Sequence, residues 1–398
     1  MRAWHFSENA YPYLPPAEQY ESIRVTLPNR NYDPKKGAEL YDRFIAEWQF
    51  AEEVGLDIML NEHHQTATCV DPCAPLLLAA LARLTSKARL LILGNPIANR
   101  RQPVRVAEEM AFADVLSKGR IEAGFVRGVP WEIAAGNSNP VRMNERHWEA
   151  LDLIIKAWTT HDGPFSHEGR FFHHRMVNIW PRPYQQPHPP IWVSTTSPGG
   201  ATHVGERGFV QATFLTGFEG TRAVYEAYRK GWRVAGRSGG VPINRLAYAA
   251  LVYTGETDAE ARAGAEKLLW YVTANKVLPH FSNPPGYVPV AANVAMLRGA
   301  VHPLSEFSKS ASVERAISTG MMFAGTPDQV CQQIAKLYDY VGGFGHLLIM
   351  GQAGHLEHEE TKRGTALFAR EVYPRLKEVY PDSAISGFDT HDHRQKTG

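Results

Sequence analysis

Short apolar runs alternate with longer amphipathic segments along most of the chain. The runs have the length of buried strands, and in the longer segments apolar residues recur as they do on one face of a helix. In the segment 37–54, for example, Leu40, Phe44 and Trp48 recur at intervals of four residues before a glycine ends the pattern. The pattern predicts strands at residues 4–7, 57–64, 89–95, 120–126, 190–194, 208–213, 245–253 and 345–350. It predicts helices at residues 37–54, 74–86, 103–116, 142–159, 220–235, 257–276, 327–340 and 361–380, and a short helix that ends at 206.

The number and order of these elements predict the fold. Eight strands are each followed by a helical pattern, and such alternation requires right-handed crossovers between parallel strands. Eight units favour an α/β fold of the (β/α)8 TIM barrel type, with insertion loops, over an open doubly wound sheet. No linker interrupts the pattern, so residues 1–398 are expected to form a single TIM-barrel domain. Two long connections, 8–36 and 277–319, are the expected insertions, and the second is the predicted lid over the active site.

Composition narrows the class of protein. The formal net charge is +1 with no basic stripe, which argues against nucleic acid as a partner. No apolar run is long enough to cross a membrane, and the first residues lack the apolar stretch of a secretion signal. The three cysteines form no CxxC pair, which is typical of a reduced, cytoplasmic protein. We therefore expect a cytoplasmic enzyme that acts on a small molecule.

Polar clusters follow four of the predicted strands. The C-terminal ends of parallel barrel strands lie on one face, where active sites are built. The second strand ends in Glu62, His63 and His64, which are the candidate catalytic residues. The clusters after the third, fourth and fifth strands are the candidate cofactor-binding residues: Gly94 and Asn95, Arg127 and Gly128, and Thr196, Ser197 and Gly200.

The cluster after the fifth strand has the composition of a phosphate site. Hydroxyl groups and glycines precede a helix there, and a helix N-terminus attracts anions. Arg127 is able to bind the same anion with two parallel N–H groups. Each feature alone has an ordinary structural interpretation, as a helix cap, a glycine turn or a surface arginine. Their joint placement on one face favours a phosphorylated ligand.

No metal site is predicted. His161, His167, His173 and His174 fall at irregular spacing in the connection after the helix 142–159, and this spacing matches no zinc pattern. The strand end at Glu62 also has a plain structural interpretation, as a salt-bridged terminus with one buried histidine.

Several short motifs occur in a family-specific order and spacing. They are Glu62-His63-His64, Gln102-Pro103-Val104-Arg105 with Ala107-Glu108, Ser117-Lys118-Gly119-Arg120, Arg127-Gly128, Val193 through Gly200, Gly205-Glu206-Arg207-Gly208 and Gly325-Thr326-Pro327. With these motifs the chain resembles the bacterial luciferase-like, flavin-dependent monooxygenases, a family of (β/α)8 barrels that use reduced FMN and oxygen. The resemblance extends from the first helix to Met350.

The resemblance implies a role for each candidate residue. His63 matches the catalytic imidazole, and Glu62 and His64 either orient it or brace the strand. The family's residue pair beside the isoalloxazine ring corresponds to Gly94 and Asn95. The family's arginine that binds the flavin phosphate corresponds to Arg127, which Gly128 follows. The other residues that bind this phosphate correspond to Thr196, Ser197 and Gly200. Two luciferase-type acids are replaced, by Thr196 and by Ile133, which argues against light emission.

The resemblance also implies the reaction. Reduced FMN would be a cosubstrate delivered by a separate NAD(P)H-dependent flavin reductase, and with O2 it would form a flavin peroxide that oxygenates a small organic substrate. A homodimer is implied as well. Phe281, Tyr287 and His280 in the predicted lid, with Trp4 and Phe6 expected at the barrel mouth, favour an apolar or aromatic substrate.

Three other functions remain open from the sequence. The first is a deazaflavin-dependent oxidoreductase on the same barrel. The second is a metal-dependent hydrolase barrel that uses His63 and His64. The third is a flavin-binding protein without turnover.

Overall fold

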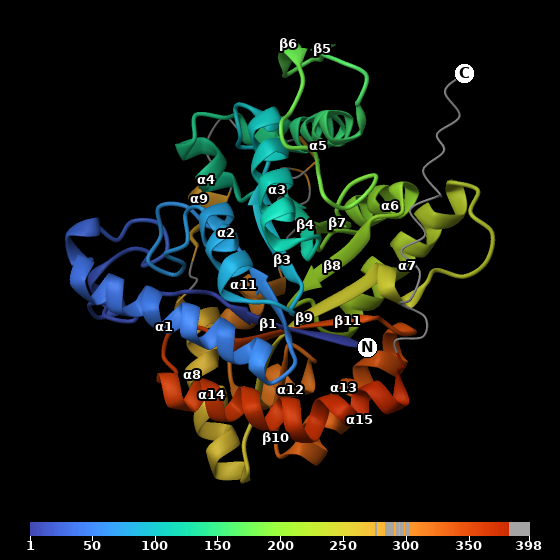
Figure 1. Ribbon diagram of the computed structural model, residues 1–398. Coiled ribbons are helices and arrows are strands. Elements are labelled where there is room, and N and C mark those ends of the chain that lie inside the picture. Colours follow the sequence, from blue (N-terminus) through green and yellow to red (C-terminus); the bar gives the residue numbers. More distant parts are fainter. Residues whose placement is uncertain (275–276, 283–289, 292–293, 295–297, 299–302, 382–398) are drawn as a thin grey trace.

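Eight parallel strands close into a barrel in the computed structural model, which describes residues 1–274, 277–282, 290–291, 294, 298 and 303–381 (Figure 1). The barrel closes because the first part of β9 pairs with β8 on one side and with β11 on the other. The predicted (β/α)8 TIM barrel is confirmed, and its eight strands are those that the sequence predicts. They are β1 (Arg2–Ser7), β2 (Asp57–Leu60), β3 (Leu90–Pro96), β4 (Ile121–Val126), β7 (Ile191–Ser194), β8 (Val210–Phe214), β9 (Leu246–Thr254) and β11 (His346–Gln352).

Helices cover the outside of the barrel (Figure 1). Their starts follow local chemistry: the Asp33 side chain accepts a hydrogen bond from the Lys35 amide at the start of α1, and Thr326 with Gln329 forms a capping box at the start of α13. The described helices are α1 (Pro34–Glu53), α2 (Ala74–Leu84), α3 (Pro103–Ser117), α4 (Pro130–Ala135), α5 (Met143–Thr159), α6 (Pro198–Arg207), α7 (Gly217–Val234), α8 (Asp258–Ala274), α9 (Pro279–Ser282), α11 (Pro303–Ser308), α12 (Val313–Ser318), α13 (Pro327–Val341), α14 (His358–Leu367) and α15 (Tyr373–Val379), with a π-helical turn at Phe368–Val372.

Apolar side chains form two layers. Alternate strand residues such as Ile58 and Ile92 point outward and pack against the helices, whereas Met59 and Leu91 point into the barrel. The barrel floor is aromatic: the Trp4 indole donates to Nδ1 of His346 at 3.2 Å and packs edge-on against Trp192. The expectation that Trp4 lies at the barrel mouth is therefore wrong, because residue 4 is paired with Asp57, where β2 begins.

The sequence pattern missed several short elements, among them helices α9, α11 and α12 in the predicted lid. The extra strand β10 (Met322–Gly325) pairs with the end of β9, beyond the point where β8 leaves it. The hairpin of β5 (Phe165–Glu168) and β6 (His173–Val177) projects from the segment expected to be irregular, and helix α4 follows the Arg127 loop. Residues 283–289, 292–293, 295–297 and 299–302 of the predicted lid, 277–319, lie outside the described residues, and its role as a lid stays a prediction.

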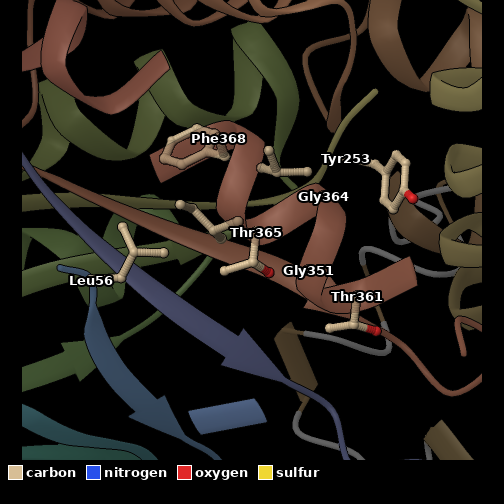
Figure 2. A pocket seen from close by; sticks show the side chains of 9 residues that line it. Leu56, Tyr253, Gly351, Thr361, Gly364, Thr365 and Phe368 are labelled. Atoms are coloured by element: carbon tan, nitrogen blue, oxygen red, sulfur yellow. The ribbon is translucent and has the colours of Figure 1, made fainter. Parts of the chain in front are cut away.

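A void of about 10 Å³ lies between the barrel wall and α14 (Figure 2). Leu56, Tyr253, Gly351, Thr365 and Phe368 are among the residues that line it. Its volume is about that of one water-sized probe, so it is a packing defect and holds no organic ligand.

No helix in the described part of the chain has the length and apolar character needed to span a membrane.

Candidate active site

The imidazole of His63 lies at the C-terminal end of β2 among three charged or polar side chains. Its Nδ1 is 2.9 Å from Oε1 of Glu132 on α4, and its Nε2 is 3.7 Å from Oε1 of Glu8, which follows β1. Nη2 of Arg24, from the first long connection, is 3.2 Å from Nδ1 and 3.3 Å from Nε2. These groups come from segments far apart in the chain, and the common direction of the strands brings them together.

Glu8 and Glu132 differ in their ionisation. Burial raises the pKa of Glu8 above its ordinary value, and the opposing influence of His63 and Arg24 does not reverse this shift. Burial also raises the pKa of Glu132, but the hydrogen bond from His63 and the nearby charges outweigh it and leave this pKa below its ordinary value. The pKa values of the two carboxyl groups that flank His63 are thus shifted in opposite directions, downward for Glu132 and upward for Glu8.

Glu62 and His64 form a separate ion pair. Oε1 of Glu62 is 2.9 Å from Nε2 of His64 and 2.5 Å from Nη2 of Arg100. Its other oxygen accepts the Ala74 amide at the first residue of α2, at 3.1 Å. Glu62 thus fixes the strand end to the next helix, which agrees with the bracing role that the sequence left open.

Arg127 lies beside an open cavity of about 310 Å³, which is lined by Arg127, Asn144, Trp148, Gly199, Gly200 and His203. The guanidinium is largely buried, and burial lowers its pKa. Among the described residues it has no carboxylate partner within ion-pair distance. A buried cation without an anion at the N-terminus of α6 is a suitable group for an anionic ligand.

Ser197 and Thr196 do not line this cavity, although the sequence analysis expects them to bind the phosphate. The hydroxyl of Ser197 accepts the Gly200 amide at 3.3 Å and caps α6, and Thr196 is exposed. Neither lines the cavity, whereas Gly200 does. Their predicted contact with phosphate stays a prediction.

Gly94 and Asn95 lie between the His63 and Arg127 regions of the rim. A Cβ atom at residue 94 would approach the Glu62 backbone nitrogen to 2.6 Å, so only glycine fits there. The strand pairing shifts at this point, which marks a β-bulge. The Asn95 side chain is fully buried, and neither of its polar atoms has a hydrogen-bond partner in the described structure. An unpaired buried amide is costly unless a ligand bonds to it.

Sequence reasoning missed Arg24, Glu132, Asn144 and His203. Arg24 is in a Pro-rich connection, and Glu132 is in a helix of only six residues, so neither has a local signal. Gly128 lies against α4: a Cβ atom at this residue would approach the Ile133 side chain to 3.0 Å.

One described part of the predicted lid lies near the site. Helix α9 contacts α4, and the two lie side by side in Figure 1. His280 of α9 is 3.7 Å from Glu21 of the first long connection. Tyr287, which the sequence assigned to the substrate pocket, lies outside the described residues.

A metal site does not emerge from the described side chains. No three His, Cys, Asp or Glu residues are gathered in the described ranges as ligands of one ion would be. His63 and His64, which a hydrolase would use together, instead pair with different carboxylates.

The barrel places His63 with its carboxyl neighbours and the Arg127 cavity on one rim, as candidate groups for proton transfer and for anion binding. Comparisons with known proteins give the family. Residues 23–343 match the family model of luciferase-like monooxygenases. The chain belongs to this family, and the resemblance seen in the sequence is confirmed.

Named relatives are flavin-dependent. The chain is 31% identical over 188 residues to the oxygenase component of a flavin-dependent trigonelline monooxygenase from Acinetobacter baylyi, across 46% of this chain and 51% of that protein. It is 25% identical over 349 residues to an FMNH2-dependent dimethylsulfone monooxygenase from Pseudomonas putida, across 85% of this chain and 88% of that protein. The match to the trigonelline enzyme thus spans about half of its length. These names agree with the expected class of enzyme.

A solved structure supports the fold independently. The monooxygenase RslO1 from Streptomyces bottropensis superposes with a TM-score of 0.71 at 22% identity, over 94% of this chain and 99% of that one.

The buried carboxyl of Asp71 gives this site a pH-dependent stability. Burial, and next the charge of Glu62, raise its pKa to about 8, and the Asp71 carbonyl accepts the His63 amide at 3.3 Å. A raised carboxyl pKa means that the folded state binds the proton more tightly, so stability is lost as the pH rises from about 4 to about 8.

We predict that Asp71→Asn, which is neutral at every pH, abolishes this loss. Its stability should match that of the wild type near pH 4 and exceed it increasingly toward pH 8, which urea unfolding at both ends of the range measures. The exposed Asp162→Asn is the matched control and should show no such trend. A constant difference between Asp71→Asn and wild type across the range would contradict the assignment.

Proposed function

We propose that this chain is the oxygenase of a two-component, FMN-dependent monooxygenase, which uses reduced FMN and O2 to oxygenate a small organic molecule. The observation that carries the proposal is Arg127: a largely buried guanidinium with no carboxylate partner among the described residues, on a cavity at the N-terminus of α6 and on the same rim as His63. The FMN-dependent relative supports the choice of cofactor.

The described residues fit FMN in three ways. Arg127 and the Gly199 and Gly200 backbone would hold the phosphate. Asn95 has two unpaired polar atoms for the polar edge of the flavin ring. Gly94 leaves room where a side chain would collide with the Glu62 backbone. When bound, reduced FMN would supply the reaction with oxygen.

The chain's own residues would manage protons and exclude water. The imidazole of His63 has one nitrogen that donates and one that accepts, and it lies at the rim between two carboxyl groups, so it can hold or pass a proton. Helices α4 and α9, with the first long connection, cover this part of the rim and would limit access of water. The lid role of 277–319 is part of this proposal.

The substrate would be apolar or aromatic. Phe6, Phe214 and Tyr271 form an edge-to-face series near Glu8, with ring centroids 6.2 and 6.1 Å apart. Tyr271 also interacts with the Glu8 carboxyl, so this apolar wall continues to the acid–base centre. Of the two aromatic residues expected at the barrel mouth, Phe6 belongs to this proposed substrate wall and Trp4 does not.

A separate NAD(P)H-dependent flavin reductase would deliver the reduced FMN. The relative in Acinetobacter baylyi is named as an oxygenase component, which supports a second component for this chain.

We also propose a homodimer that associates through α2 and α3. Leu76 and Leu84 on α2 and Phe112 and Val115 on α3 are exposed by 40 to 71%, and the two helices pack side by side.

Two variants separate flavin binding from chemistry. Arg127→Ala removes a charged phosphate contact and should weaken FMN binding by about 1.5–3 kcal/mol, while riboflavin affinity stays nearly the same. His63→Ala should bind FMN as the wild type does and lose most substrate oxygenation. Fluorescence titration with both flavins measures the first effect, and quantification of the oxygenated product measures the second.

Each variant serves as the control for the other. An equal loss of FMN and riboflavin affinity in Arg127→Ala would show that Arg127 does not bind the phosphate. Undiminished oxygenation by His63→Ala would remove His63 from the reaction.

The proposed dimer can be tested by placing a charged residue on its apolar surface. Phe112→Asp places a carboxylate in an apolar contact and should raise the dimer dissociation constant by at least about tenfold, which equals about 1.4 kcal/mol. Sedimentation at several concentrations measures it. Val379→Asp, on the exposed face of α15, is the control and should sediment as the wild type. A monomeric wild type, or an unchanged Phe112→Asp, would contradict the proposal.

A further inference from the structure

The imidazole of His63 has two inequivalent acid neighbours. Nδ1 is within hydrogen-bond distance of Glu132, at 2.9 Å, whereas Nε2 is 3.7 Å from Glu8, which is too far for a hydrogen bond. Nη2 of Arg24 is almost equally distant from both nitrogens and therefore distinguishes neither. The difference between the two ring nitrogens comes from the carboxyl groups.

The two carboxyl groups also differ in charge. Burial raises the pKa of Glu132, but the hydrogen bond with His63 and the nearby charges outweigh it and hold this pKa below its ordinary value, so the carboxylate accepts the ring hydrogen. Burial raises the pKa of Glu8, and the Asn61 amide donates to its Oε2 at 2.8 Å. At 3.7 Å from Nε2, the Glu8 carboxyl is too distant to compete with Glu132 for the ring hydrogen.

Local structure holds Glu132 in this place. Its backbone carbonyl accepts the Asn99 side-chain amide at 3.4 Å, and the carboxyl is 3% exposed. The neighbouring Trp131 lies over the Arg24 guanidinium at 5.5 Å, and Arg24 in turn donates to Thr68 at 2.9 Å. Helix α4 thus fixes both the anion at Nδ1 and the cation beside the ring.

We propose that Glu132 is a positioning residue that holds the hydrogen of His63 on Nδ1, so that Nε2 keeps its lone pair toward Glu8 and the barrel mouth and is the atom that exchanges protons. When Nε2 accepts a proton, the ring becomes a cation whose Nδ1–H still donates to the Glu132 carboxylate, and returning the proton restores the neutral ring. This inference rests on the proposed function for its catalytic meaning, but the tautomer itself does not depend on flavin.

Glu62 does not share this role, although it precedes His63 in the chain. Its two oxygens bind Nε2 of His64, Arg100 and the Ala74 amide, and none contacts His63. The residue that orients the imidazole is thus Glu132, 69 positions away in the sequence.

The tautomer can be observed directly. Flavin-free protein labelled with 15N in histidine gives two-bond proton–nitrogen correlations that distinguish Nδ1–H from Nε2–H, and His63→Ala identifies the signals of His63. We expect wild-type His63 to have its hydrogen on Nδ1. Glu132→Gln should shift the population toward Nε2–H, and the exposed Glu168→Gln, which removes a surface His–Glu pair with His173, should leave His63 unchanged. A wild-type His63 with its hydrogen on Nε2 overturns the proposal, whether or not Glu132→Gln folds.

A second measurement tests the role in the reaction. Reduced FMN is bound anaerobically and mixed with oxygen, and the rate of reoxidation is followed by absorbance. Glu132→Gln and His63→Ala should change this rate by a similar factor, at least about tenfold, within the range that a positioned acid or base contributes. The dissociation constant for FMN should stay within about twofold of that of the wild type. A Glu132→Gln protein that reoxidises FMN at the wild-type rate overturns the positioning role.

The two measurements distinguish the inference from the proposed function. If wild-type protein fails to bind reduced FMN, the proposed function fails, while the nitrogen spectrum still decides the tautomer. If wild-type protein binds FMN and reacts with oxygen but has its hydrogen on Nε2, only the inference fails.

Discussion

Closure of a parallel sheet is the constraint on which the site depends. Because β9 pairs with β8 and β11 at once, all eight strands point the same way around the barrel, and their C-terminal ends share one rim. Glu8, His63, Asn95 and Arg127 each follow or end a different strand, so they converge without being near in sequence. The first long connection adds Arg24 to this rim, and helix α4 adds Glu132.

At the rim, burial and hydrogen bonding give chemically similar carboxyl groups different pKa shifts. Glu132 and Glu8 both flank His63, but the hydrogen bond from the imidazole holds one ionised, while desolvation favours the neutral form of the other. Asp71, directly behind the same loop, is also kept from ionising. A centre in which two carboxyl groups with oppositely shifted pKa values flank one imidazole is suited to proton transfer.

The sequence predicted the barrel well because buried parallel strands leave continuous apolar runs. All eight barrel strands were found, and His63 and Arg127 were found because they end or follow such runs. Helix α4 was missed because six residues are too short for a helical period to show. Glu132 and Arg24 were missed for another reason: they join His63 across 69 and 39 positions, and no local pattern encodes such contacts. The assignment of Trp4 to the mouth failed because an apolar pattern gives the face of a strand but not its depth in the barrel.

The central claim is that this barrel binds reduced FMN and directs its reaction with oxygen. The most direct test is an anaerobic absorbance titration of the protein with reduced FMN and, separately, with a reduced deazaflavin, each followed by rapid mixing with oxygenated buffer. We predict saturable binding of reduced FMN and a transient spectrum that differs from both reduced and oxidised FMN before oxidised flavin appears. Failure to bind reduced FMN, or tight binding of the deazaflavin with no reaction with oxygen, would contradict the claim.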